Sequence, residues 1–186
     1  VEKNGRLDPE RVKAALREDT ILVSVMLANN EVGVIHPINE IGAIVKEHGA
    51  LFHIDGVQGV GKIPFDVGEA RADMVSLSAH KIGGPKGTGA LWLADPDQRT
   101  PLLRGGGQES RHRAGTEGIA GILGFAAALD AVEPGEPTML ARHRDMLEAR
   151  ARELVPDCVI VAADVDRLAH ITAIALPGVS AMTQVM

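Results

Sequence analysis

Short apolar runs alternate with amphipathic stretches along the first half of the chain. Residues 21–26 form an almost continuous apolar run of strand length, which is typical of a parallel strand buried on both faces. Residues 37–48 carry isoleucine and valine at helical spacing and are followed by Gly49, a common helix terminator. Residues 51–54 and 73–77 predict two further strands, each followed by polar residues.

The order strand, loop, helix, strand predicts an α/β fold with a mostly parallel sheet flanked by helices and joined by right-handed crossovers. Asp8 and Pro9 predict a helix start, with Asp8 as the N-cap. Residues 89–94 predict a strand that turns back from a glycine-rich loop. A helix is expected to open at Gly115-Thr116-Glu117, with Thr116 as its candidate N-cap, and to run through Ile119 to Ala131.

The best domain boundary is the sequence Pro134-Gly135-Glu136-Pro137. We therefore expect a large domain over residues 1–133, lacking its N-terminal part, and the beginning of a small α+β domain over residues 138–186. The small domain should start with a charged helix and continue with strands near residues 159–161 and 171–176. We expect the sequence to be a fragment, because it starts with valine and ends in an amphipathic segment without a stop signal.

Composition excludes several classes of protein. The 186 residues are 45% hydrophobic, enough for a sizeable core, and the net charge of −6 comes from interspersed acids and bases. Nothing indicates a nucleic-acid face or a membrane surface, and no apolar run is long enough to cross a bilayer. The single cysteine rules out an internal disulfide and favours a reducing, cytoplasmic location, and the histidines lack the spacing of metal ligands.

Polar side chains gather after three of the predicted strands. Asn30 follows the first, Asp55 and Gln58 follow the second, and Ser78, His80 and Lys81 follow the third. Open α/β sheets bind ligands at the carboxyl ends of their strands. A lysine between a buried strand and a glycine-rich loop suits an amine that acts as a nucleophile. Pyridoxal phosphate (PLP) needs such a lysine as a Schiff base, and an acid such as Asp55 on its pyridinium nitrogen.

Each of these residues also has a purely structural interpretation. Lys81 could be a solvated loop lysine, Asp55 a cap, Gln58 a solvent-facing residue and His80 a satisfied loop histidine. Ser78 could bond the local backbone, and Asn30 could be a turn former. The clustering at the strand ends favours a site there and the functional interpretation of Lys81 and Asp55, whereas Asn29 is expected to be a turn former and Lys86 a loop lysine.

Three motifs, in this order and spacing, resemble the cysteine desulfurases, PLP enzymes of the class V aminotransferase group. The motifs are HIDGVQ at residues 53–58, SLSAHKIGGPKGTGAL at 76–91, and GGGQE at 105–109 leading to RAGT at 113–116. The resemblance is strong from Asp19 to about Leu129. It implies the PLP fold type I and conversion of L-cysteine to L-alanine, with sulfur passed as an enzyme persulfide to iron–sulfur clusters or thiolated cofactors.

The resemblance also implies individual roles. Lys81 would carry PLP and shuttle a proton at the substrate α-carbon, and Lys81 and His80 would be the catalytic residues. Gln58 would bond the ring hydroxyl, and Ser78 and His80 would bind the phosphate and ring. Asn30 would contact the cofactor. Thr116 would reach the PLP phosphate of a partner subunit, which requires a homodimer. A sulfur-acceptor protein is a further expected partner.

Cys158 is expected to be a small core residue at the start of a buried strand, and not the persulfide-forming cysteine. That cysteine, the N-terminal phosphate loop, the ring-stacking histidine and the arginine for the substrate carboxylate are expected outside this sequence. The 186 residues alone are therefore expected to be inactive. Two alternatives are another class V PLP enzyme, such as an aminotransferase or selenocysteine lyase, and a non-catalytic remnant.

Overall fold

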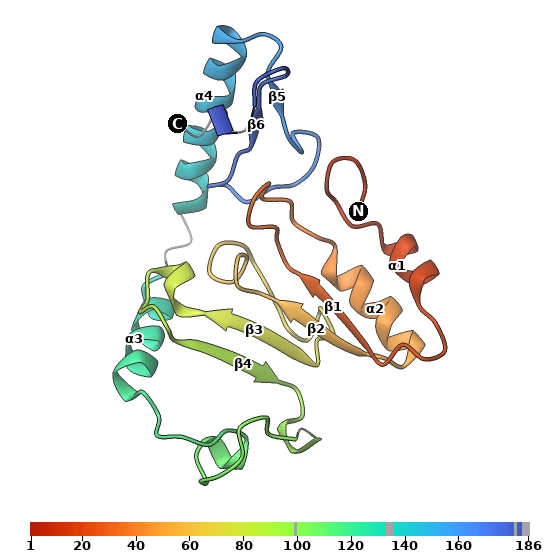
Figure 1. Cartoon of the computed structure of the whole chain (residues 1–186), viewed down its shortest axis with the longest axis vertical. Coiled ribbons are helices and arrows are strands. Elements are labelled where there is room, and N and C mark those ends of the chain that lie inside the picture. Colours follow the sequence, from red (N-terminus) through yellow and green to blue (C-terminus); the bar gives the residue numbers. More distant parts are fainter. Residues whose placement is uncertain (99, 133–135, 181, 184–186) are drawn as a thin grey trace.

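The computed structural model describes residues 1–98, 100–132, 136–180 and 182–183. Its centre is a four-stranded sheet in the order β1 (Leu22–Met26), β2 (Leu51–Asp55), β3 (Met74–Ser78) and β4 (Gly89–Leu93) (Figure 1). The first three strands are parallel, and β4 runs antiparallel to β3. The predicted fold class, a mostly parallel sheet flanked by helices, is confirmed.

The main core lies between the sheet and helix α2 (Ile38–His48). Ile41 and Val45 of this helix are fully buried, as are Phe52 and Ile54, which share one face of β2. Gly49 ends α2 in the left-handed conformation, as the sequence predicted. Helix α1 (Pro9–Ala15) packs beside α2, and the Asp8 side chain caps it through the Glu10 amide.

The first strand is less buried than its sequence predicted. Val25 lies in the core, but Leu22 is 47% exposed and Ile21 is 81% exposed. Among the described residues β1 is an outer strand with β2 as its neighbour, and α2 covers only the face that carries Val25. The apolar run at residues 21–26 therefore predicted the strand correctly, but the prediction that both faces of this strand are buried is wrong.

Helix α3 (Ile119–Asp130) follows β4 through two short 3-10 helices, η2 (Pro96–Gln98) and η3 (Glu109–Arg111). Gly118 occupies the N-cap position of α3 without a side-chain hydrogen bond, so the prediction that Thr116 caps this helix is wrong. α3 packs against another 3-10 helix, η1 (Ala79–Ile82), which follows β3. Phe125 is the buried residue of α3.

A second group of elements consists of helix α4 (Glu136–Leu154) and the antiparallel strands β5 (Val159–Ile160) and β6 (Ile174–Ala175). The predicted boundary falls partly on residues 133–135, which lie outside the described residues, and the division into two domains stays a prediction. No helix within the described ranges combines the length and the apolar character needed to cross a bilayer.

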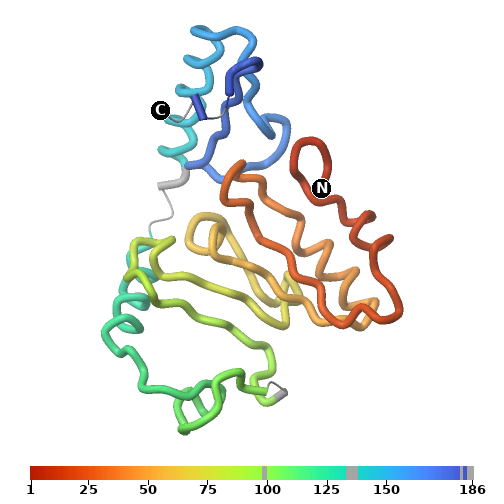
Figure 2. Tube along the Cα trace, viewed as in Figure 1, coloured from red at the N-terminus to blue at the C-terminus, as the bar shows by residue number. Residues whose placement is uncertain are grey.

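The loop that follows β5 returns to the sheet and joins the two groups of elements. Figure 2 shows this loop beside the segment that follows β1. The Leu168 amide donates to the Gly33 carbonyl at 2.8 Å, and the Ile35 amide donates to the Asp166 carbonyl at 2.9 Å. The backbone itself therefore anchors the loop at the junction.

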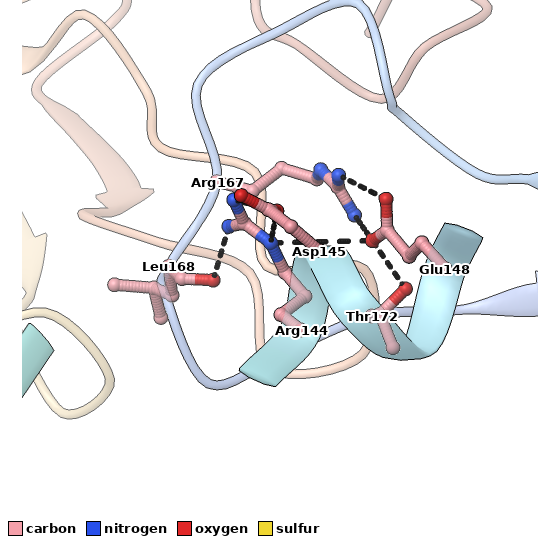
Figure 3. Close-up of polar contacts among 6 residues, drawn as sticks. All are labelled: Arg144, Asp145, Glu148, Arg167, Leu168 and Thr172. Atoms are coloured by element: carbon pink, nitrogen blue, oxygen red, sulfur yellow. Dashed lines mark hydrogen bonds and ion pairs between the residues drawn. The ribbon is translucent and has the colours of Figure 1, made fainter. Parts of the chain in front are cut away.

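A charged cluster fastens the same loop to α4 (Figure 3). Glu148 is only 5% exposed, and its carboxylate accepts from Arg167 at 2.9 Å and from the Thr172 hydroxyl at 2.7 Å. Arg144 lies 4.0 Å from the same carboxylate and donates to the Leu168 carbonyl at 3.3 Å. Burial alone would raise the pKa of Glu148. The hydrogen bonds from Arg167 and Thr172 and the charges of Arg167 and Arg144 together outweigh burial, so the pKa of Glu148 lies below 4.5.

We expect Glu148→Gln to lower the free energy of unfolding by about 3–5 kcal/mol at pH 7, because it leaves Arg167 buried without its counter-charge. A depressed pKa in the folded state stabilises the protein above the unfolded pKa, and this contribution is lost as the pH falls through the folded pKa. The substitution should therefore cost progressively less below roughly pH 4.5. Urea unfolding at several pH values measures both effects.

The matched control is Glu153→Gln, which removes an exposed ion pair from the same helix. Arg150 and Glu153 lie 2.8 Å apart with side chains 64% and 66% exposed, so the control should cost about 1 kcal/mol or less. Equal losses in the two variants would show that the buried cluster does not fasten the loop.

Candidate cofactor and active site

The parallel strands bring the predicted site residues to one edge of the sheet. Asp55 pairs with Met26 of β1 on one side and with Ser76 of β3 on the other. Backbone bonds continue past the strand ends, from the Leu27 amide to the Asp55 carbonyl at 2.8 Å and from the Gly56 amide to the Ser76 carbonyl at 3.0 Å. Residues that follow β2 and β3 are therefore held side by side.

Asp55 is the last residue of β2 and is half-buried. One of its carboxylate oxygens accepts from the Val57 amide at 3.0 Å, which fixes the side chain at the start of the turn. This bond is the local cap that the structural interpretation anticipated, but a carboxylate has two oxygens and several lone pairs. The carboxylate keeps acceptor capacity for a ring nitrogen.

Ser78 and His80 form a hydrogen-bonded pair at the end of β3. The Ser78 hydroxyl lies 2.8 Å from His80 Nδ1, so Ser78 bonds a side chain here and not the local backbone that the structural interpretation proposed. His80 is exposed, and Ser78 is half-buried. Together they offer a hydroxyl and an imidazole, two groups that can bind a phosphate or a ring.

Lys81 lies one residue further, in η1, and is half-buried. It lines a cavity of about 390 Å³ between η1, the end of α3 and the first part of α4. The cavity walls are mainly small and apolar, and they include Ile82, Ala128 and Leu140. Such a cavity is large enough for part of a small ligand.

Of the predicted site residues, Lys81 alone lines this cavity, and Asn30 and Thr116 lie in the turn after β1 and in the loop before α3. Asn30 is exposed in the turn after β1, where the neighbouring Asn29 side chain accepts from the amides of Glu31 and Val32 at 2.8 and 2.9 Å. Asn29 is therefore the turn former that we expected. Thr116 is exposed and lines a different cavity, also of about 390 Å³, with Arg113 and Glu117.

Two polar features of this region were not predicted. A hydrogen-bonded row crosses three strands, from the Ser24 hydroxyl to His53 Nδ1 at 2.7 Å and from His53 Nε2 to the Ser76 hydroxyl at 2.8 Å. It lies on the sheet face that Asp55 shares, because residues two apart on a strand point the same way. The alternation of His53 with Phe52 and Ile54 was its only signal.

The other feature is Lys62, which lines the same cavity as Lys81 and donates to Gln58 Oε1 at 3.4 Å. Gln58 is half-buried. The spacing of four residues between Gln58 and Lys62 was visible in the sequence, but residues 56–63 carry no helical pattern that would have made it meaningful.

Cys158 is not the buried strand residue that we expected. It is partly exposed and lies in the turn before β5, where its amide donates to the Val155 carbonyl at 2.9 Å. The prediction failed because β5 has only two residues and Val159 is itself 50% exposed.

The turn that carries Cys158 follows the far end of α4 from the Lys81 cavity. Leu140 lines the cavity and Leu154 ends the helix, and the rise per residue of an α-helix places roughly 20 Å of helix between them.

The groups at this edge of the sheet fit PLP as a set. An amine for the aldehyde, a carboxylate for the ring nitrogen and an amide for the ring hydroxyl follow two adjacent strands, and the Ser78–His80 pair follows the same strand as the amine. The same groups offer no soft ligands and no compact carboxylate cluster. These donors are of the kinds that a pyridine-aldehyde cofactor would need.

Comparison with known proteins gives consistent matches. The sequence profile described as aminotransferase class-V matches residues 1–185. The cysteine desulfurase IscS of Anaeromyxobacter sp. (strain Fw109-5) is 57% identical over 136 residues, which are 70% of this chain and 33% of that protein. A NifS-like protein from Rickettsia africae ESF-5 is similar in structure, with a TM-score of 0.91 and 36% identity over 99% of this chain and 52% of that one.

A structure of SspA in complex with cysteine is similar as well, with a TM-score of 0.78 and 32% identity over 88% of this chain and 46% of that one. The chain thus spans between a third and about half of the length of these proteins.

Proposed function

The chain belongs to the class V aminotransferase family, and from this premise we propose that it carries the PLP site of a cysteine desulfurase. The reaction converts L-cysteine and an enzyme thiol into L-alanine and an enzyme persulfide, whose sulfur serves iron–sulfur clusters or thiolated cofactors. The names of the relatives support the reaction, and the cysteine complex of SspA supports the substrate. The observation that carries the proposal is the position of Asp55 and Lys81 after adjacent parallel strands.

Each predicted site residue has a proposed role toward PLP or the substrate. Bound PLP supplies an electron sink for negative charge at the substrate α-carbon. Asp55 would hold the proton on the ring nitrogen, Gln58 would donate to the ring hydroxyl, and Ser78 with His80 would hold the phosphate and the ring. The Lys81 amine would be the group that holds the cofactor through its aldehyde, and the free amine would move a proton at the substrate α-carbon.

The remaining proposed roles involve partners. Thr116 is exposed and lines a separate cavity with Arg113, which supports a homodimer in which Thr116 reaches the PLP phosphate of the second subunit, while Asn30 would contact the cofactor within its own subunit. A sulfur-acceptor protein would take the persulfide sulfur, and we propose that both work in the reducing cytoplasm. Size measurement of the PLP-loaded protein tests the dimer.

The experiment that tests the function supplies the full-length protein with PLP, L-cysteine and a reductant, and measures sulfide and alanine. Equal amounts of the two products are expected. A keto acid in place of alanine would indicate an aminotransferase, turnover confined to selenocysteine would indicate a selenocysteine lyase, and no turnover would indicate a non-catalytic protein.

We expect the 186 residues alone to release no sulfide, even with PLP present. Cys158 is the sole thiol of the chain, and about 20 Å of α4 separate its turn from the cavity wall at Leu140, too far for direct attack on a substrate bound to Lys81. The measurement is sulfide release by this chain and by Cys158→Ser. Steady turnover that the substitution removes would identify Cys158 as the sulfur acceptor and contradict this assignment.

A further inference from the structure

A second lysine faces the cavity in which Lys81 lies, and the proposed function gives it no role. Lys62 follows Gln58 by four residues in a compact turn after β2. The Val60 amide donates to the Gly56 carbonyl at 3.0 Å, and the Lys62 amide donates to the Gly59 carbonyl at 2.9 Å. These bonds wind the chain so that residues 58 and 62 lie on the same side of the turn.

Gly61 brings this turn close to Lys81. Its φ is +78°, and a Cβ at this position would lie 2.9 Å from Ile82 Cγ2 and 3.3 Å from Val132 Cγ2. A side chain there would be strained in conformation and would collide with η1, so glycine is required. The close packing sets Lys62 beside Lys81 at the cavity, where burial and then the charge of Lys81 lower the pKa of Lys62.

The contact between Lys62 and Gln58 selects one orientation of an amide. Lys62 Nζ donates to Gln58 Oε1 at 3.4 Å. An ammonium has donors and no acceptor, so it can face only the oxygen end of the amide. The NH2 end of Gln58 is then left for another acceptor. Without the lysine, the two ends of the amide are nearly equal in shape and either could face the ring.

We propose that Lys62 is a positioning residue that holds the Gln58 amide so that its NH2 group donates to the ring hydroxyl oxygen of PLP. The inference rests on the proposed function, because it concerns the same cofactor site. Lys62 acts through Gln58 and does not touch the reacting atoms. Loss of Lys62 should matter only while Gln58 is present.

The test is a double-mutant cycle on PLP binding by the full-length protein. PLP is removed, and the apparent Kd is measured from the visible absorbance that returns on titration. Lys62→Met should weaken binding about tenfold, the usual effect of losing a hydrogen bond to a charged group. Lys62→Arg should restore binding to within about threefold, because the guanidinium also only donates. In a Gln58→Ala background, Lys62→Met should change the Kd less than about twofold.

The matched control is Lys86→Met, which removes a lysine from the exposed glycine loop and should leave the Kd unchanged. If Lys62→Met destabilises the PLP-free protein, Lys62→Gln replaces it, and this variant should bind PLP with intermediate strength, since its amide can present either end. Additive effects of the Lys62 and Gln58 substitutions would overturn the inference. A wild-type protein that gains no band with PLP would overturn the proposed function as well, whereas equal Kd values for wild type and Lys62→Met would overturn the inference alone.

Discussion

We expect Lys81→Ala to remove the visible absorbance of the PLP-loaded protein and to reduce sulfide release to background. The amine of Lys81 is half-buried in η1, directly after β3, and it opens on the cavity between η1, α3 and α4. Of the two lysines that line this cavity, Lys62 follows the turn after β2 and donates to Gln58 Oε1, whereas Lys81 directly follows β3. Alanine there takes away both the covalent link and the group that moves the α-proton.

The measurement is an absorbance spectrum and a sulfide assay on wild-type and variant full-length protein after incubation with PLP. Lys86→Ala is the matched control, because it removes a lysine five residues away from the exposed part of the glycine loop. Wild-type absorbance and turnover are expected for the control. A variant at Lys81 that keeps its turnover would show that another amine carries the cofactor.

Asp55→Asn is expected to keep PLP bound while slowing turnover by about 10²–10³-fold, the usual effect of losing one preorganised electrostatic partner. An amide in this position can still accept the bond from the Val57 amide, so the turn after β2 should persist. A neutral amide does not stabilise a protonated ring nitrogen. The ring then stabilises negative charge at the substrate α-carbon poorly.

The comparison requires kcat for wild type and variant together with the amount of bound PLP. Asp66→Asn is a control in an exposed turn, where the carboxylate accepts from the amides of Gly68 and Glu69 at 2.7 and 2.9 Å. Its kcat should stay near the wild-type value. Near-normal turnover in Asp55→Asn would remove Asp55 from the proposed role.

The sequence predicted most of what positions the site. Strand-length apolar runs, a glycine after α2 and Asp8 before α1 were enough to place the elements, because each signal is local to its element. The parallel order of β1 and β2 fits the helical connection through α2, whereas turns without a helix connect β2 to the parallel β3. The family resemblance, which rested on three motifs that begin in β2, in β3 and after β4, is confirmed by the profile match over residues 1–185.

The failures concern burial and contacts that depend on tertiary packing. Leu22 is exposed because β1 is an outer strand in the described part of the chain, and an apolar run does not reveal its neighbours. Cys158 is partly exposed because β5 is too short to bury it. Gly118, and not Thr116, precedes α3 because the chain turns later than the capping pattern suggested.

Lys62 was missed for a different reason. Its position depends on how closely the turn after β2 packs on η1, and this approach is set by Gly61 against Ile82. The sequence contains both residues but not their distance. Contacts between two loops that follow adjacent strands are therefore the hardest part of such a site to predict from sequence patterns.

The most direct test of the central assignment is borohydride reduction of the PLP-loaded full-length protein, followed by proteolysis and mass spectrometry of the tagged peptide. Reduction converts the link between lysine and PLP into a stable bond, so the tag marks the lysine that carried the cofactor. The account predicts a single tag on Lys81. A tag on Lys62 or Lys86 in place of Lys81 would contradict it.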